Sequence, residues 1–156
     1  MRERERDKNP FGRAAELRVV HQCLLAWYAK EARDLPWRRT RDPYRILVSE
    51  VMLQQTQVER VVPAYEAFLA RFPTIEHLAA APLAEVIAAW EGLGYNRRAV
   101  YLWRAAREIV ERYRGVFPRD RRHLEQLPGV GRYTAGAVLC FAFAEPVAFW
   151  DTNIAR

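Results

Sequence analysis

Apolar residues recur along this sequence at every third or fourth position, in one stretch after another, and no stretch alternates convincingly as a β-strand does. Glycine and proline interrupt the pattern at Gly92–Gly94, Gly115–Pro118 and Pro128–Gly131, where turns are expected. The sequence shows no internal repeat. It therefore predicts an all-α protein with about nine helices joined by short turns.

The helices can be placed from the apolar period and from capping residues. Asp42 and Pro43 have the order of an N-cap followed by a proline in the first helical turn. Residues 1–13 alternate in charge and are predicted to form a mobile tail. We expect helices at residues 14–32, 42–54, 58–72, 75–81 and 82–90, from about 95 to 113, at 120–127 and 132–144, and a last one beginning at Asp151.

Length and composition fit one soluble globular domain. The chain has 156 residues, of which 51% are hydrophobic and 28% charged. Its formal net charge is +6 and its pI is about 9.7, which mildly favours an anionic partner such as nucleic acid. The longest charge-free apolar stretch, 133–144, is too short to span a membrane, and residues 1–8 do not begin a signal peptide.

Cysteine usage points to a reducing compartment. Cys23 and Cys140 are the only cysteines, and both lie in apolar helical stretches. Such cysteines are typical of an intracellular protein, so a cytoplasmic location is expected. No group of histidine, cysteine and acidic residues has the spacing of metal ligands, and no metal site is predicted within this chain.

Two acidic residues, Glu50 and Asp151, stand in apolar surroundings. Glu50 lies in the apolar stretch 46–53, where burial raises the pKa of a carboxyl and favours its protonated form. Asp151 follows the apolar residues 146–150, but the N–H groups of a helix start at 152–153 favour its ionised form. One carboxyl kept as an acid and another kept as an anion is the pair that cleavage of a glycosidic bond requires.

Residues 127–135 join a short helix to a long one through Gly129 and Gly131. Both glycines are expected to take positive φ values and to let another molecule approach the backbone closely. The following helix presents free N–H groups and its positive dipole end at the turn, and Arg132 adds charge there. This pattern favours a clamp for the DNA backbone.

Two further segments are predicted to be exposed. Gln54–Gln57 is a cluster rich in amides that follows the Glu50 helix, and Gly94–Arg98 places Tyr95 beside two arginines. Amides can reach base edges, and an aromatic ring can wedge into a base stack. Both segments are therefore candidates for contact with nucleic acid.

Each of these features also has a purely structural interpretation. Glu50 can pair with a buried arginine such as Arg38, and Asp151 can be only an N-cap. Residues 128–131 can form a plain corner between two helices, and the two exposed segments can be helix caps with solvated faces. Residue types and spacing alone leave these alternatives open.

In combination, four motifs resemble the A/G-specific adenine DNA glycosylases of the helix-hairpin-helix glycosylase superfamily. The resemblance runs from about residue 15 to the last residue, and the segment around Glu50 is its most specific part. The motifs are, in chain order, Ser49–Gln57, Gly92–Tyr95, Leu127–Gly131 and Asp151–Asn153.

The resemblance implies base excision repair, in which adenine mispaired with 8-oxoguanine or guanine is flipped out of double-stranded DNA and its N-glycosidic bond is hydrolysed. Glu50 is then the general acid that protonates the adenine at N7, and Asp151 stabilises the sugar cation. Tyr133 and Asn153 form hydrogen bonds in the same pocket, and Arg38 contacts the flipped base. The DNA-binding residues expected from the resemblance are Gln54, Gln55, Thr56, Tyr95, Gly129, Val130, Gly131, Arg132 and Thr134.

The fold implied by the resemblance is a six-helix barrel over residues 35–156, with the helix-hairpin-helix at about 120–144. Residues 14–34 then belong to a second subdomain that is incomplete here, because the family's four cysteine ligands of a [4Fe–4S] cluster lie beyond Arg156. The two cysteines of this chain do not correspond to those ligands. We expect a monomer with no membrane partner and with apolar surface on helix 14–34. An inactive or weakly DNA-binding fragment is the alternative to an active enzyme.

A sister family, the endonuclease III-like enzymes, is a further alternative. These enzymes remove oxidised pyrimidines and also cut the strand, with a lysine nucleophile in the helix after the hairpin. The matching position here is Tyr133, and residues 128–156 contain no lysine. The resemblance therefore favours an enzyme that hydrolyses the base bond without lyase chemistry.

Overall fold

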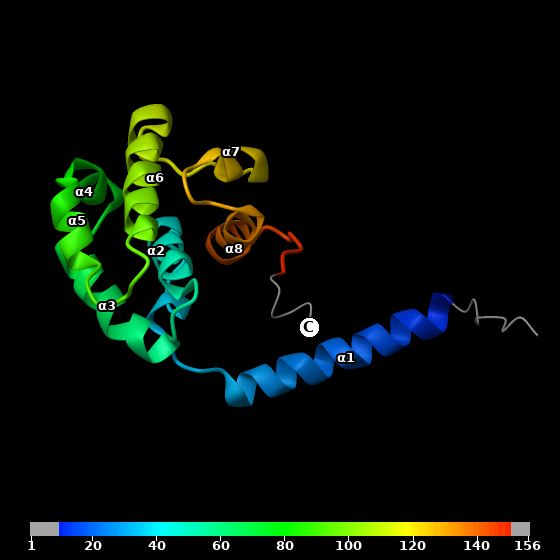
Figure 1. The fold of residues 1–156 in the computed structure, drawn as a ribbon. Helices are drawn as coiled ribbons and strands as arrows, with labels where there is room; N and C mark the ends of the chain where they lie inside the picture. Colours follow the sequence, from blue (N-terminus) through cyan, green and yellow to red (C-terminus); the bar gives the residue numbers. More distant parts are fainter. Residues whose placement is uncertain (1–9, 151–156) are drawn as a thin grey trace, which may run out of the picture. The chain divides into compact units, whose positions relative to one another are not determined.

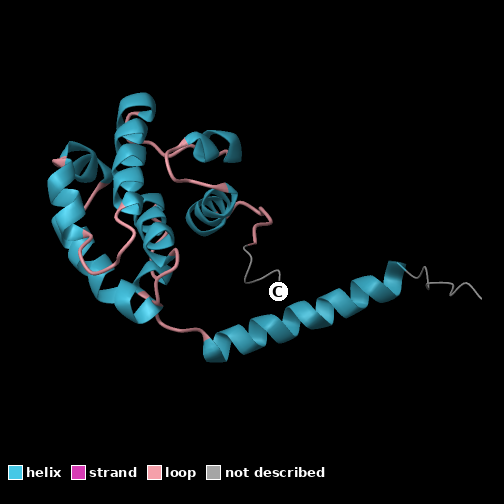
Figure 2. Cartoon of the chain, viewed as in Figure 1, coloured by secondary structure: helices cyan, strands magenta, loops and turns pink. Residues whose placement is uncertain are grey.

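The computed structural model describes the backbone of residues 10–150 and the side chains of residues 16–150. Within these ranges it contains eight α-helices and one 3₁₀ turn and no strand, so the all-α prediction is confirmed (Figure 2). The chain divides between Asp34 and Leu35 into two compact units. The predicted helix beginning at Asp151 lies outside the described residues.

Among its described residues the first unit contains one helix, α1, Pro10–Glu31. It begins four positions before the predicted start at residue 14, because proline is well accommodated in the first turn of a helix. Its apolar residues have the helical spacing seen in the sequence, and their side chains are exposed. They are Leu17, Val20, Leu24, Leu25 and Tyr28. No helix in residues 10–150 is both long and apolar enough to cross a bilayer.

The second unit holds the other helices (Figure 1). Their boundaries lie within about three residues of the predicted ones, a usual uncertainty at helix ends. The elements are the 3₁₀ turn η1 (Pro36–Arg38), α2 (Pro43–Leu53), α3 (Val58–Arg71), α4 (Ile75–Ala80), α5 (Leu83–Ala89), α6 (Arg97–Tyr113), α7 (Arg121–Gln126) and α8 (Arg132–Phe143).

Helix α2 lies at the centre of this unit. It packs against α3, α6 and α8, while α6 also packs against α4 and α5, and α7 packs against α8 (Figure 1). Its apolar side chains are buried all round the helix, as a helix surrounded by other helices requires. Glu50 is therefore carried by the most enclosed helix of the second unit.

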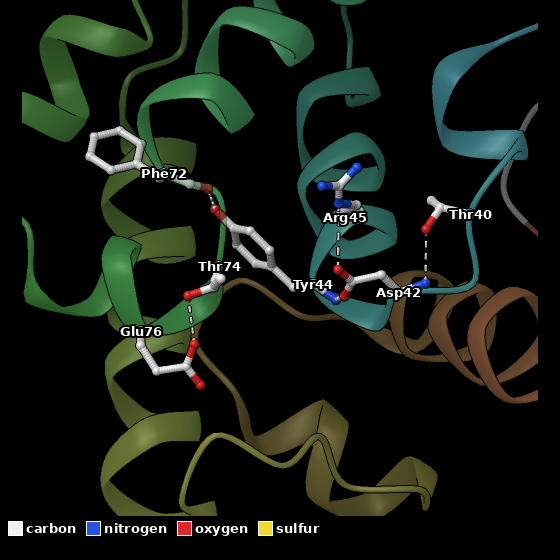
Figure 3. A network of polar contacts seen from close by, with 7 residues as sticks. All are labelled: Thr40, Asp42, Tyr44, Arg45, Phe72, Thr74 and Glu76. Carbon is white, nitrogen blue, oxygen red and sulfur yellow. Dashed lines mark hydrogen bonds and ion pairs between the residues drawn. The ribbon is translucent and has the colours of Figure 1, made fainter.

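The N-terminal end of α2 is fixed by polar contacts that Figure 3 draws. Asp42 accepts a hydrogen bond of 2.9 Å from the N–H of Tyr44, which confirms the predicted cap. Arg45 forms an ion pair with Asp42 at 3.5 Å. The buried hydroxyl of Tyr44 donates to the carbonyl of Phe72 at 2.7 Å and so ties the start of α2 to the end of α3. These contacts hold the helix that positions Glu50.

Candidate active site

Glu50 is half-buried on α2, and its neighbours Ser49 and Val51 are buried. Burial raises the pKa of the Glu50 carboxyl to about 7, in the direction expected from its apolar surroundings. Within the described residues no hydrogen bond or ion pair reaches this carboxyl, so the suggested pairing with Arg38 is wrong. Arg38 itself is exposed.

A carboxyl with a pKa near 7 is suited to proton transfer at neutral pH. About half of such groups are protonated at pH 7, so the group can donate its proton and can also be reprotonated at this pH. An unpaired, partly solvent-accessible carboxyl can also reach a bound molecule. Glu50 therefore has the properties of a general acid, whereas most other carboxylates of the second unit are exposed.

Tyr133 lies in the first turn of α8, the helix that packs against α2. It is half-buried, and its ring meets that of Phe149 edge-on with centroids 5.3 Å apart. Together with Arg132, Ala148 and Trp150 these two residues line a recess of about 110 Å³. The helix contact thus brings the elements that carry Glu50 and Tyr133 together.

Residues 144–150 lead from α8 towards Asp151 and are anchored at two points. Arg121 of α7 donates to the carbonyl of Ala148 at 3.0 Å. Phe149 packs on α8 at Gly136, and its ring also meets that of Phe141 edge-on at 5.6 Å. Two other proposed catalytic residues, Asp151 and Asn153, lie outside the described residues, so the structure describes only the segment that leads to them.

The hairpin at 128–131 has one left-handed glycine and not two. Gly129 has a φ of 75°, and a Cβ there would lie 2.7 Å from the Cβ of Tyr101 on α6. Gly131 has φ −87° and ψ 179°, an extended conformation open to any residue, so the positive φ expected for it is wrong. The space that a Cβ of Gly131 would occupy is open. Gly129 is thus required by the fold, and Gly131 leaves room at the surface.

The start of α8 has the geometry of an anion site. The first intrahelical hydrogen bond runs from the N–H of Ala135 to the carbonyl of Gly131, and no side chain caps the helix. Arg132 is exposed beside this helix end. The side chains of Val130 and Thr134 are buried, so these two predicted DNA contacts are restricted to their backbone groups.

The two predicted contact segments are exposed, as expected for Gln54, Gln55 and Tyr95, while Thr56 is half-buried. Tyr95 has 67% of its surface exposed. Gln55 and Tyr95 have φ values of 55° and 48°, which is uncommon for residues with a Cβ. Both segments therefore present side chains from an unusual backbone conformation.

Sequence reasoning placed Arg98 in the exposed aromatic–basic cluster, but it is 9% exposed and its guanidinium lies inside the fold. The helical period of α6 indicates the burial of Arg98, because Arg98 falls on the same face as Leu102, Ala105 and Ile109, all of which are buried. Its partners are backbone carbonyls and the hydroxyl of Thr56, which no pattern in the sequence identifies.

The residues present do not fit the [4Fe–4S] cluster that the resemblance implies. Such a cluster is held by four cysteine thiolates, and the sequence contains two cysteines. Cys23 belongs to the first unit and Cys140 to the second. No group of three or more potential metal ligands occurs in the part of the chain that the structure describes. No chemical step is therefore assigned to a cluster.

Residues 48–156 match the model of the HhH-GPD superfamily base excision DNA repair proteins. The adenine DNA glycosylase of Homo sapiens is 46% identical over 155 residues, which cover 94% of this chain and 28% of the human protein. That of Mycolicibacterium smegmatis is 52% identical over 134 residues, covering 85% of this chain and 46% of the relative. The chain thus spans less than half the length of these curated relatives.

Solved structures of DNA glycosylases have the same fold. A thermostable thymine-DNA glycosylase has a TM-score of 0.81 at 36% identity, covering 87% of this chain and 63% of that chain. A trapped endonuclease III–DNA covalent intermediate has a TM-score of 0.76 at 25% identity, covering 91% and 67%. The helix-hairpin-helix glycosylase fold expected from the motifs is confirmed. This chain belongs to the HhH-GPD superfamily of base excision DNA repair proteins.

Proposed function

We propose that this protein excises adenine mispaired with 8-oxoguanine or guanine from double-stranded DNA. The observation that carries the proposal is Glu50, a half-buried carboxyl with no ion-pair or hydrogen-bond partner among residues 16–150, whose pKa is about 7. The similarity to adenine DNA glycosylases of two organisms supports adenine as the base. The whole reaction is a hydrolysis, so it needs no oxidant or reductant.

The proposed chemistry divides the work between two carboxyl groups. Glu50 gives its proton to N7 of the flipped adenine, and the bond between the sugar carbon and the adenine nitrogen breaks as the protonated base leaves. Asp151, as the anion, stabilises the positive charge on the sugar. Water then adds its hydroxyl to the sugar carbon and releases a proton. Tyr133 and Asn153 are assigned hydrogen bonds in the pocket, and Arg38 a contact with the flipped base.

DNA is proposed to bind through its phosphates at the hairpin and through its bases at the two exposed segments. The uncapped start of α8, the open space at Gly131 and the exposed Arg132 suit a phosphate group. Gln55 and Tyr95 are assigned to the duplex near the flipped base, where an amide and an aromatic ring can replace lost stacking and pairing. We further propose a cytoplasmic monomer.

Two alternatives have specific support. The first is a chain that binds DNA without excising adenine, because the match covers only 28% of the human relative and 46% of the mycobacterial one. The likeness to an endonuclease III trapped covalently on DNA favours a lyase. Lyase chemistry by that route requires an amine, and Tyr133 stands at the position concerned, so the hydrolytic proposal is the better supported.

A single-turnover excision assay tests the proposal. The 156-residue chain is incubated with a duplex that holds adenine opposite 8-oxoguanine, beside the variants Glu50→Gln and Glu66→Gln. Glu66 is an exposed carboxylate on α3 and serves as the matched control. Excision by the parent and the control, with none by Glu50→Gln, supports the proposal. Excision by Glu50→Gln at the parent rate would remove Glu50 from the mechanism, and DNA binding without excision by the parent would favour the non-excising alternative.

A further inference from the structure

One guanidinium joins the two exposed segments of the candidate DNA-binding surface. Arg98 is buried at the start of α6, and its two terminal nitrogens donate to oxygens from the end of α2 and from the loop before α6. The acceptors are the carbonyls of Val51 (2.9 Å), Met52 (2.9 Å), Gln54, Leu93 (3.2 Å) and Gly94 (3.1 Å) and the hydroxyl of Thr56 (3.0 Å).

Two of these acceptors directly precede the residues with left-handed backbone. The carbonyl of Gln54 is followed by Gln55, at φ 55°, and that of Gly94 by Tyr95, at φ 48°. A left-handed conformation is unfavourable for residues with a Cβ and persists where surrounding contacts enforce it. Arg98 donates to the carbonyl of the peptide group that precedes each of these two residues. Its contacts therefore help to keep both residues in the left-handed conformation.

Further contacts place the same guanidinium next to the exposed ring. The Cζ of Arg98 lies 5.7 Å from the ring centroid of Tyr95 and 5.5 Å from that of Trp90. The indole N–H of Trp90 donates to the carbonyl of Gly94 at 3.3 Å, and Arg60 donates to that of Gly92. The loop before α6 is thus held by three side chains, of which Arg98 alone also holds the carbonyls of α2.

No carboxylate accepts from Arg98 in the part of the chain described here. Its charge is balanced by carbonyl dipoles, including those at the end of α2, where a cation is favoured. A planar guanidinium carries N–H groups on two terminal nitrogens that point in different directions, so it can donate to two segments at once. The ammonium group of lysine is a single compact group with a shorter reach between acceptors. Lysine at this position would keep the charge but could not hold both segments.

We propose that Arg98 is a positioning residue that fixes Gln55 and Tyr95 relative to each other before DNA arrives. The inference rests on the proposed function, because it takes these two side chains to enter the duplex. Segments already held in their binding conformation need no ordering on association, so the arrangement favours a mispair that both side chains can reach at once. Arg98 itself touches neither the base nor the sugar.

The test compares Arg98→Lys with Arg104→Lys. Arg104 is exposed on the same helix, and within the described residues it forms no hydrogen bond or ion pair with either segment, so it controls for the arginine-to-lysine change. Hydrogen exchange followed by mass spectrometry is measured on the free proteins. We expect faster exchange in Arg98→Lys over both 52–57 and 92–95, with α4 and α8 unchanged, and no effect in Arg104→Lys.

The second readout is the ratio of affinities for a duplex with adenine opposite 8-oxoguanine and for a fully paired duplex. In Arg98→Lys this ratio should fall on the order of 10-fold or more, because misplacement by about 1 Å is costly, while affinity for paired DNA stays the same. A general loss of folding would instead lower both affinities. Unchanged exchange in Arg98→Lys, or looser segments with an unchanged ratio, would overturn the inference.

Thr56→Val covers the case in which Arg98→Lys does not fold. It removes one acceptor of Arg98 from the first segment, so faster exchange across the loop 92–95 would show coupling through the guanidinium. No change in that loop would contradict the coupling. A parent chain that binds both duplexes equally would overturn the proposed function, and with it the role in the duplex. The exchange data distinguish this outcome, because they do not depend on DNA.

Discussion

Gly136 lies so close to Phe149 that no side chain fits between them. A Cβ built at Gly136 would lie 2.5 Å from the Cβ of Phe149, well inside van der Waals contact. The pair brings the chain after α8 back onto the buried face of that helix, two residues before Asp151. The position proposed for the second carboxyl therefore depends on a glycine in the middle of a helix, where glycine is otherwise unfavourable.

We predict that Gly136→Ala displaces Phe149 from α8. Overpacking of this kind typically destabilises a protein by about 1–3 kcal/mol. The rate of excision should fall by about 100-fold even at temperatures where the variant stays folded, because Asp151 follows the displaced segment. Urea denaturation and the single-turnover assay measure the two effects. Arg121→Gln, which removes the other anchor of this segment, should act in the same direction but less strongly. A fully active Gly136→Ala protein would contradict this account.

Local features were predictable from the sequence because their causes are local. The cap at Asp42, the helix periods and the break at Gly92–Gly94 each depend on residues a few positions apart. Gly136 and Arg98 depend on segments that are distant in the chain and meet only in the fold. The hairpin glycines show the same limit, since the spacing does not reveal which of Gly129 and Gly131 takes the left-handed conformation.

The raised pKa of Glu50 predicts a pH-dependent loss of stability. The carboxyl has a pKa of about 7 in the folded protein against an ordinary value of 4.5, so the folded state binds more protons between these values. Stability contributed by the protonated form is therefore present below pH 4.5 and is lost as pH rises through 7. The difference corresponds to up to about 3 kcal/mol.

Glu50→Gln should remove this dependence, since the amide does not ionise. We expect the variant to be more stable than the parent at pH 8 by up to about 3 kcal/mol, with the advantage shrinking towards pH 4.5. Urea denaturation across this pH range measures it, and Glu66→Gln, on an exposed carboxylate, should follow the parent curve. Parallel curves for the parent and Glu50→Gln would mean that Glu50 is not desolvated in the folded protein.

Arg132 is predicted to contact one phosphate. Affinity for paired DNA should fall steeply with salt in the parent, and Arg132→Gln should lower the slope of log affinity against log salt by about one. Arg112→Gln is a suitable control. Arg112 is exposed near the end of α6, whereas Tyr101, which packs on the hairpin at Gly129, lies near the start of that helix. Equal slopes for the parent and Arg132→Gln would place Arg132 away from the DNA backbone.

The hairpin glycines should separate folding from binding. Gly129→Ala places a Cβ 2.7 Å from the Cβ of Tyr101 and forces a non-glycine residue to φ 75°, so it should lower the free energy of unfolding by about 1–3 kcal/mol. Gly131→Ala meets no atom within 4 Å and has an ordinary φ, so its stability should stay within about 0.5 kcal/mol of the parent.

At position 131 an alanine should leave folding unchanged but should weaken the binding of DNA. Its added methyl group would occupy the space at the uncapped start of α8 where a phosphate is proposed to sit. Binding of Gly131→Ala to paired DNA, measured by fluorescence anisotropy, should therefore weaken although the protein melts like the parent. Gly131→Ala that binds DNA as the parent does would show that the hairpin is only a corner between α7 and α8, and that the phosphate contacts lie elsewhere.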